Sequence, residues 1–147
     1  MRHAALLLPG LDRLAGAERQ VMLLARGLRK RNWRVSVVVL SGWGGATAHE
    51  LEDTGIAFHS LGMRKGLVDP RGWIRFHRWL RKNSPDVVHS HLPHAAWLAR
   101  GSRLFARIPV LIDTVHSSWT GGAGRRAVYC ISSWLPDAVT TVSQSAA

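Results

Sequence analysis

Hydrophobic residues in this chain fall into short unbroken runs that alternate with amphipathic segments. The first run, residues 4–8, contains only alanine and leucine, and residues 35–40 contain four valines and a leucine around a single serine. Aliphatic runs of this length are typical of strands that a parallel sheet buries on both faces. Similar runs recur along the chain, and we expect strands at residues 4–8, 35–40, 56–61, 86–91, 109–116 and 138–142.

Between these runs the apolar positions take on a helical period. After the small residues 15–17, five apolar side chains fall on one face of a helix, while arginines and a lysine occupy the other side; the five are Ala17, Val21, Leu24, Ala25 and Leu28. Asp69 followed by Pro70 predicts a capped helix start, and Gly55 is suited to end a helix. We expect further helices at residues 47–54, 70–82, 93–105 and 125–135.

Strands and helices thus alternate along the whole chain. This order predicts an α/β fold, a doubly wound and mostly parallel Rossmann-like sheet of about six strands, with ligands at the carboxyl ends of the strands. The length of 147 residues and the apolar content of 46% suit one domain with a substantial core. A helix start at Ser143, four residues before the last residue, leads us to expect that the chain is part of a larger protein.

Composition sets the expected compartment. No segment approaches the ~20 apolar residues of a membrane-spanning helix, and residues 4–8 are shorter than the roughly 7–15-residue apolar region of a secretory signal. Cys130 is the only cysteine, so no intramolecular disulfide can form, which agrees with a reducing compartment. We therefore expect a cytoplasmic protein, with Cys130 in the core because it lies in the apolar segment 127–131.

Positive charge is concentrated in one part of the chain. The net charge is +11, and residues 60–110 hold ten lysines or arginines against Asp69 and Asp86. Within the helix predicted at residues 70–82, the cations lie opposite an apolar stripe of Trp73, Phe76 and Leu80, with Trp79 on its flank. This predicts either a merely solvated basic face or a surface for anionic membrane or a phosphate-bearing acceptor. The residues of that surface are Arg64, Lys65, Arg71, Arg75, Arg78 and Lys82.

The turn at Ala15, Gly16 and Ala17 is similar to a phosphate-binding loop. Small residues allow backbone N–H groups to approach an oxyanion, and the positive end of the helix dipole favours it. Glu18 in the first turn stabilises the dipole but repels phosphate, so a plain strand-to-helix turn is an equal alternative. Neither a dinucleotide fingerprint nor a P-loop motif is present.

Histidines follow two of the predicted strands. His89, His91 and His94 surround the end of the fourth strand and His116 ends the fifth, so neighbouring parallel strands should bring them together. With His94 or Asp113 as a third ligand they suggest zinc, but no second acidic or cysteine ligand is evident, and lining of a cleft is the favoured interpretation. The lone aspartates, Asp113 included, are interpreted as caps or strand-edge residues.

Four segments in this order resemble the N-terminal half of a family 4 glycosyltransferase of GT-B fold. They are residues 15–20 with 24–28, then 85–91, 114–117 and 139–143. The resemblance implies two Rossmann-like lobes, of which residues 1–147 form the acceptor-side lobe, while a C-terminal donor-binding lobe is absent from this chain. It implies retaining transfer from a nucleotide sugar, as co-substrate, without a metal or other cofactor.

The same resemblance assigns roles to individual residues. Ala15, Gly16 and Ala17 would face the donor phosphates, His116 would be the catalytic residue near the reacting centre, and His91 and Ser117 would line the acceptor side. Ala15 departs from the family, which often has glycine there, and its methyl group restricts how closely a phosphate can approach.

The sequence leaves three candidate functions for this chain. The leading one is the acceptor lobe of a glycosyltransferase acting on a glycan or lipid-linked acceptor of the cell envelope, cytoplasmic with a peripheral membrane tendency and inactive as an isolated lobe. The second is a non-catalytic α/β module that binds anionic membrane or nucleic acid, nucleic acid being the less expected ligand. The third is a metal-dependent hydrolase that uses His89, His91 and His116.

Overall fold

The computed structural model describes residues 1–12, 15–64, 69–116, 127 and 130–142. Its centre is a six-stranded sheet in the order β3-β2-β1-β4-β5-β6, in which every neighbouring pair is parallel. The predicted doubly wound parallel sheet is therefore confirmed. The strands are β1 (His3–Leu8), β2 (Arg34–Val39), β3 (Ala57–Ser60), β4 (Val87–His91), β5 (Val110–Val115) and β6 (Ala138–Thr141).

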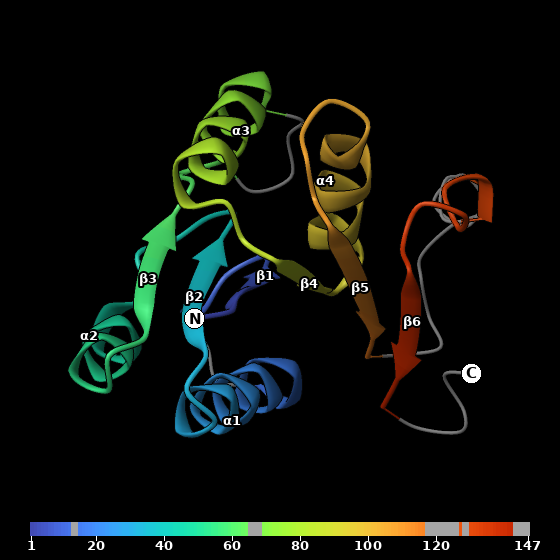
Figure 1. Cartoon of the computed structure of the whole chain (residues 1–147). Coiled ribbons are helices and arrows are strands. Elements are labelled where there is room, and N and C mark those ends of the chain that lie inside the picture. Colours follow the sequence, from blue (N-terminus) through green and yellow to red (C-terminus); the bar gives the residue numbers. More distant parts are fainter. Residues whose placement is uncertain (13–14, 65–68, 117–126, 128–129, 143–147) are drawn as a thin grey trace.

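Helices cover both faces of the sheet (Figure 1). One face packs against α1 (Gly16–Lys30) and α2 (Gly45–Asp53), and the other against α3 (Pro70–Asn83) and α4 (Pro93–Arg103). Along β1, Ala5 and Leu7 belong to the core under α3 and α4, whereas Leu6 and Leu8 belong to the core under α1 and α2. This alternation explains the unbroken apolar run, because both faces of the central strand are buried.

Capping residues define where α3 begins and where α2 ends. Asp69 accepts a hydrogen bond from the backbone N–H of Arg71, as an N-cap residue does, and Pro70 is the first residue of α3. Gly55 follows α2 with a φ of +74°, and its N–H and that of Ile56 donate to the carbonyls of Glu52 and Leu51. This is a Schellman closure, and it requires the left-handed backbone that glycine adopts without strain.

Two predictions about this architecture need qualification. Of the helix predicted at residues 125–135, residues 125, 126, 128 and 129 lie outside the described residues, residues 127, 130 and 131 are helical, and residues 132–135 form turns and a bend instead. Cys130, predicted to be a core residue, is exposed, and its neighbour Ile131 is 74% exposed. An apolar segment is buried only where another element covers it, and Cys130 and Ile131 belong to neither core cluster.

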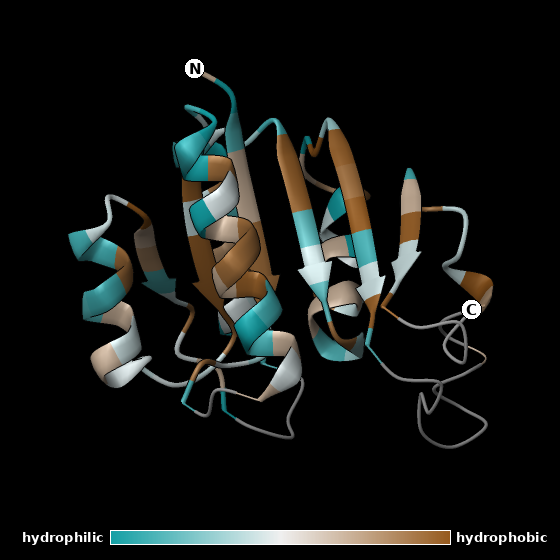
Figure 2. Ribbon diagram, turned by 90° about the horizontal axis from the view of Figure 1, so that it is seen from below, coloured by the Kyte–Doolittle hydropathy of each residue, from teal (hydrophilic) through white to brown (hydrophobic). Residues whose placement is uncertain are grey.

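Polarity changes along the strands. Figure 2 shows β4 and β5 passing from hydrophobic to hydrophilic colouring towards their carboxyl ends. The polar residues of β4 and β5 lie in the carboxyl-terminal parts of these two strands.

In the part of the chain that the structure describes, none of the helices has both the length and the hydropathy needed to span a bilayer.

Candidate functional site

The sheet order reverses direction between β1 and β4, and the candidate site lies at the carboxyl ends of these strands. β1 leads into the loop that precedes α1, so the N-terminus of α1 lies at this edge. His91 is the last residue of the adjacent β4, and His116 directly follows β5. In open α/β sheets such a reversal leaves a crevice in which ligands bind.

Three histidines, His89, His91 and His116, form a cluster at this edge. The ring centroids of His89 and His91 are 4.2 Å apart, as expected for residues i and i+2 on one face of a strand. Nδ1 of His91 lies 3.1 Å from Nε2 of His116 on the neighbouring strand. The prediction that parallel strands bring these side chains together is confirmed. His94 lies apart from them, exposed and edge-on to Trp97.

Burial keeps the histidine cluster neutral. Desolvation lowers the pKa of His89 to about 4, and the nearby His116 adds to the effect. Desolvation lowers the pKa of His91 to about 2, with further lowering from both other rings. His116 is more accessible. Burial also lowers its pKa, but the carboxylate of Glu18 in the first turn of α1 opposes that shift. At neutral pH these rings therefore act as hydrogen-bonding groups and not as cations.

Threonines extend the cluster to the edge of the sheet. Oγ1 of Thr114 is 2.6 Å from Nε2 of His89 and 2.7 Å from Oγ1 of Thr140 in β6. The hydroxyl of Thr140 also donates to the carbonyl of Asp113, at 3.4 Å. Through these hydrogen bonds His89 is held by β5 and β6, while His91 contacts His116 directly after β5. Sequence reasoning did not find the two threonines.

The turn at residues 15–17 begins α1 at the same edge. Ala15 is the N-cap with φ of −83° and ψ of −172°, an extended conformation that does not require glycine. It makes no side-chain capping bond, so among the described residues the N–H groups of the first turn have no side-chain cap. A Cβ added at Gly16 would meet no described atom within 4 Å. Ala15 and Gly16 are exposed and Ala17 is half-buried, which leaves this helix end open to a ligand.

A resident metal has no support in the described part of the chain. No group of three or more histidine, cysteine, aspartate or glutamate side chains there is arranged to hold a metal ion. Asp113, considered in the sequence as a third metal ligand, instead contacts an arginine side chain. It is fully buried and receives a hydrogen bond from Nε of Arg100, at 2.6 Å. Its interpretation as a cap or strand-edge residue is therefore wrong.

The ion pair between Arg100 and Asp113 links α4 to β5, and its members are 1% and 0% exposed. Ser90 donates to the other carboxylate oxygen of Asp113, and Arg100 donates to Ser132. Sequence reasoning missed the pair although two signals were present. Asp113 interrupts an apolar strand, and Arg100 lies on the buried stripe of α4 with Ala96.

The predicted basic surface is only partly available. Arg64, Arg71, Arg78 and Lys82 are exposed. Arg75 instead pairs with Asp69 at 3.3 Å and donates to the carbonyl of Gly62. Trp79, expected on the flank of the surface, is buried in the core under α3. Lys65 and Ser117, the remaining predicted site residues, lie outside the described residues.

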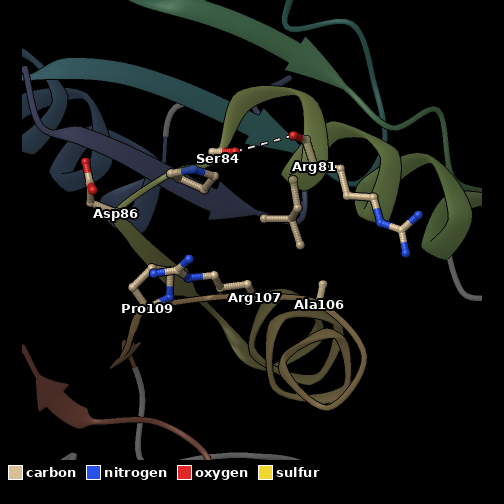
Figure 3. Close-up of a pocket in the computed structure, with 8 residues that line it drawn as sticks. Arg81, Ser84, Asp86, Ala106, Arg107 and Pro109 are labelled. Carbon is tan, nitrogen blue, oxygen red and sulfur yellow. Dashed lines mark hydrogen bonds between the residues drawn. The ribbon is translucent and has the colours of Figure 1, made fainter.

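A separate pocket lies at the amino ends of β4 and β5, at the opposite edge of the sheet from the histidine cluster. It has a volume of about 420 Å³. Figure 3 shows it between the end of α3 and the segment after α4, with Arg81 and Ser84 on one side and Arg107 and Pro109 on the other. The sequence did not predict this pocket, which is formed by the end of α3 together with the two segments that precede β4 and β5.

Comparison with known proteins adds independent information. The family model of Glycosyltransferase Family 4 matches residues 14–147. Among solved structures, that of Acinetobacter baumannii MurG is similar, with a TM-score of 0.70 and 14% sequence identity. The match covers all of this chain and 42% of the MurG chain, so this chain spans less than half the length of that protein. No curated protein matches the sequence.

Proposed function

Because the chain belongs to Glycosyltransferase Family 4, we propose that it is the acceptor-side lobe of a retaining glycosyltransferase. In this proposal the enzyme moves a sugar from a nucleotide sugar to a glycan or lipid-linked acceptor. The observation that supports it most is the convergence of the α1 N-terminus, His91 and His116 at the switch point of the sheet. A second lobe outside these 147 residues would hold most of the donor.

The α1 turn suits the donor phosphates. Backbone N–H groups of the first helical turn and the helix dipole attract an oxyanion, and the exposed Gly16 lets it come close. The carboxylate of Glu18 in the same turn would repel a phosphate, and it also raises the pKa of His116 against the effect of burial. Ala15, Gly16 and Ala17 thus face the donor phosphates in this proposal.

His116 and the acceptor side complete the proposed site. His116 is the most accessible ring of the histidine cluster and is neutral at pH 7, so it can hydrogen-bond a sugar hydroxyl without bringing a charge. His91 and Ser117 line the acceptor side. During transfer the acceptor hydroxyl oxygen forms a bond to the anomeric carbon, the bond from that carbon to the phosphate oxygen breaks, and the nucleoside diphosphate leaves with the electron pair and takes up the hydroxyl proton. Closure of two lobes would align the reactants and exclude water.

Contact with a membrane is the second part of the proposal. Arg71, Arg78 and Lys82 form the basic face of α3, and Ile74 beside them is 52% exposed. Cations next to an exposed aliphatic side chain favour an anionic bilayer surface. A lipid-linked acceptor would be presented there, on the cytoplasmic side of the membrane.

The whole gene product containing these residues provides the test. It is assayed for transfer from a panel of nucleotide sugars, together with His116→Ala and the control His94→Ala, which changes an exposed histidine outside the cluster. We expect His116→Ala to reduce turnover by at least about 100-fold with an unchanged circular dichroism spectrum, and His94→Ala to retain activity. Vesicle binding without turnover of any nucleotide sugar would instead support a non-catalytic module.

A further inference from the structure

His91 has a single polar contact within the described residues. Its Nδ1 lies 3.1 Å from Nε2 of His116, while its Nε2 is buried and has no hydrogen-bond partner there. The whole residue is only 3% exposed, so water does not readily replace that partner. The orientation of the His91 ring is therefore tied to His116 on one side and to the ring of His89 on the other.

The unpartnered Nε2 of His91 restricts where its proton lies. A neutral imidazole has one N–H and one bare nitrogen. In folded proteins, buried N–H groups without an acceptor are rarer than buried acceptors without a donor. The proton of His91 is thus better placed on Nδ1, where Nε2 of His116 accepts it. His116 must then be bare at Nε2 and carry its own proton on Nδ1.

We propose that His91 is a positioning residue for His116. By donating from Nδ1 to Nε2 of His116, it fixes the orientation of that ring and leaves the Nδ1–H of His116 as the hydrogen-bond donor offered to the substrate. The proposal rests on the proposed function and changes the part assigned to His91, which acts through His116 and not by contact with the acceptor. His116 is then a neutral donor in the reaction and not a general base.

Charge around the pair agrees with this arrangement. The titratable groups that face His116 in the described part of the chain are His91 and His89 on β4 and Glu18 on α1. Protonation of His116 at Nε2 would direct its new N–H against that of His91, and it would place a charge beside two buried rings. Burial thus lowers the pKa of His116 below its ordinary value, and the carboxylate of Glu18 acts against that lowering.

Nitrogen-15 NMR of ring-labelled histidine in the whole gene product tests the proposal directly. We expect neutral His116 and His91 both to give the chemical shifts of an Nδ1–H tautomer. In His91→Phe, which keeps a buried ring but removes the donor, the pKa of His116 should rise towards 6.5 and the Nε2–H tautomer of His116 should become populated. His94→Phe, in the exposed first turn of α4, is the matched control and should change neither quantity.

Transfer assays complete the test. We expect His91→Phe to lower kcat by about 10- to 100-fold and to move the acidic limb of the pH profile upwards, which a purely structural role would not do. An Nε2–H tautomer of His116 in the unsubstituted protein overturns the proposal even if His91→Phe fails to fold. Because the tautomer is measured without substrate, this result is separate from the proposed function, which fails if the unsubstituted protein transfers no sugar.

Discussion

Nε of Arg100 on α4 donates to Oδ2 of Asp113 on β5 at 2.6 Å, and both side chains are almost completely removed from solvent. A buried ion pair contributes little compared with well-packed apolar residues, but loss of one partner leaves a buried charge. Asp113 lies three residues before His116, on the strand that leads to this histidine. The integrity of the ion pair therefore affects both stability and the geometry of the site.

Asp113→Asn should lower the free energy of unfolding by about 3–5 kcal/mol, because the guanidinium of Arg100 is then buried without that carboxylate. Urea unfolding followed by circular dichroism measures the change. The double substitution Arg100→Met with Asp113→Leu removes both charges and should recover most of the loss. Equal instability of the single and double variants would mean that packing, and not the uncompensated charge, dominates at this position.

The N-cap of α3 offers a second stability test. Asp69→Ala should cost about 0.5–2 kcal/mol through the lost capping bond to the N–H of Arg71. The partly exposed ion pair with Arg75 adds at most about 1 kcal/mol. Asp69→Asn is the matched control, since it keeps a capping oxygen and loses only the charge. A loss in Asp69→Asn as large as in Asp69→Ala would show that the ion pair matters more than the cap.

Acid should destabilise the protein below pH 6.5. His89 and His91 have folded pKa values of about 4 and about 2, so below their ordinary value of 6.5 the unfolded chain binds protons that the folded chain does not. Their stabilising effect is complete above pH 6.5 and is lost progressively as the pH falls, by at most about 1.4 kcal/mol per pH unit for each histidine.

Urea unfolding at pH 7.5 and pH 5.0 measures this dependence, in a range where few ordinary carboxylates titrate. His89→Phe should flatten it, because the variant has one fewer buried imidazole. The exposed His94 provides the control, and His94→Phe should leave the slope unchanged. A slope that is the same in all three proteins would contradict neutral burial of His89.

Vesicle binding tests the basic face of α3. Replacing Arg71 and Arg78 by glutamine removes two exposed charges and should weaken binding to vesicles containing phosphatidylglycerol by about 30-fold, at about 1 kcal/mol for each charge. Lys30→Gln with Arg31→Gln, at the end of α1 on the opposite face of the sheet, is the matched control. Sedimentation that does not depend on anionic lipid content would argue against this surface.

The candidate site shows what local pattern can and cannot predict. The apolar runs and the placement of His91 and His116 at strand ends predicted that they lie at one edge of a parallel sheet, because carboxyl ends of parallel strands share an edge. The hydrogen bond between them was not predictable, since it depends on the register of β4 and β5. The prediction that Trp79 lies on the flank of α3 was wrong for a related reason. The position of α3 over the sheet decides which of its aromatic rings is buried, and this position depends on tertiary packing.

By itself the sequence determined the alternation of strands and helices, the capped start at Asp69, the turn at Gly55 and the family, because these follow from residue periods and short motifs. Only the tertiary structure decided that Arg100 meets Asp113, that Glu18 acts on His116 and that Cys130 is exposed. Such relationships depend on strand order and on which elements cover one another. Those are set by packing over the whole chain, so the pattern within one segment can show that a residue is buried but not which partner it meets.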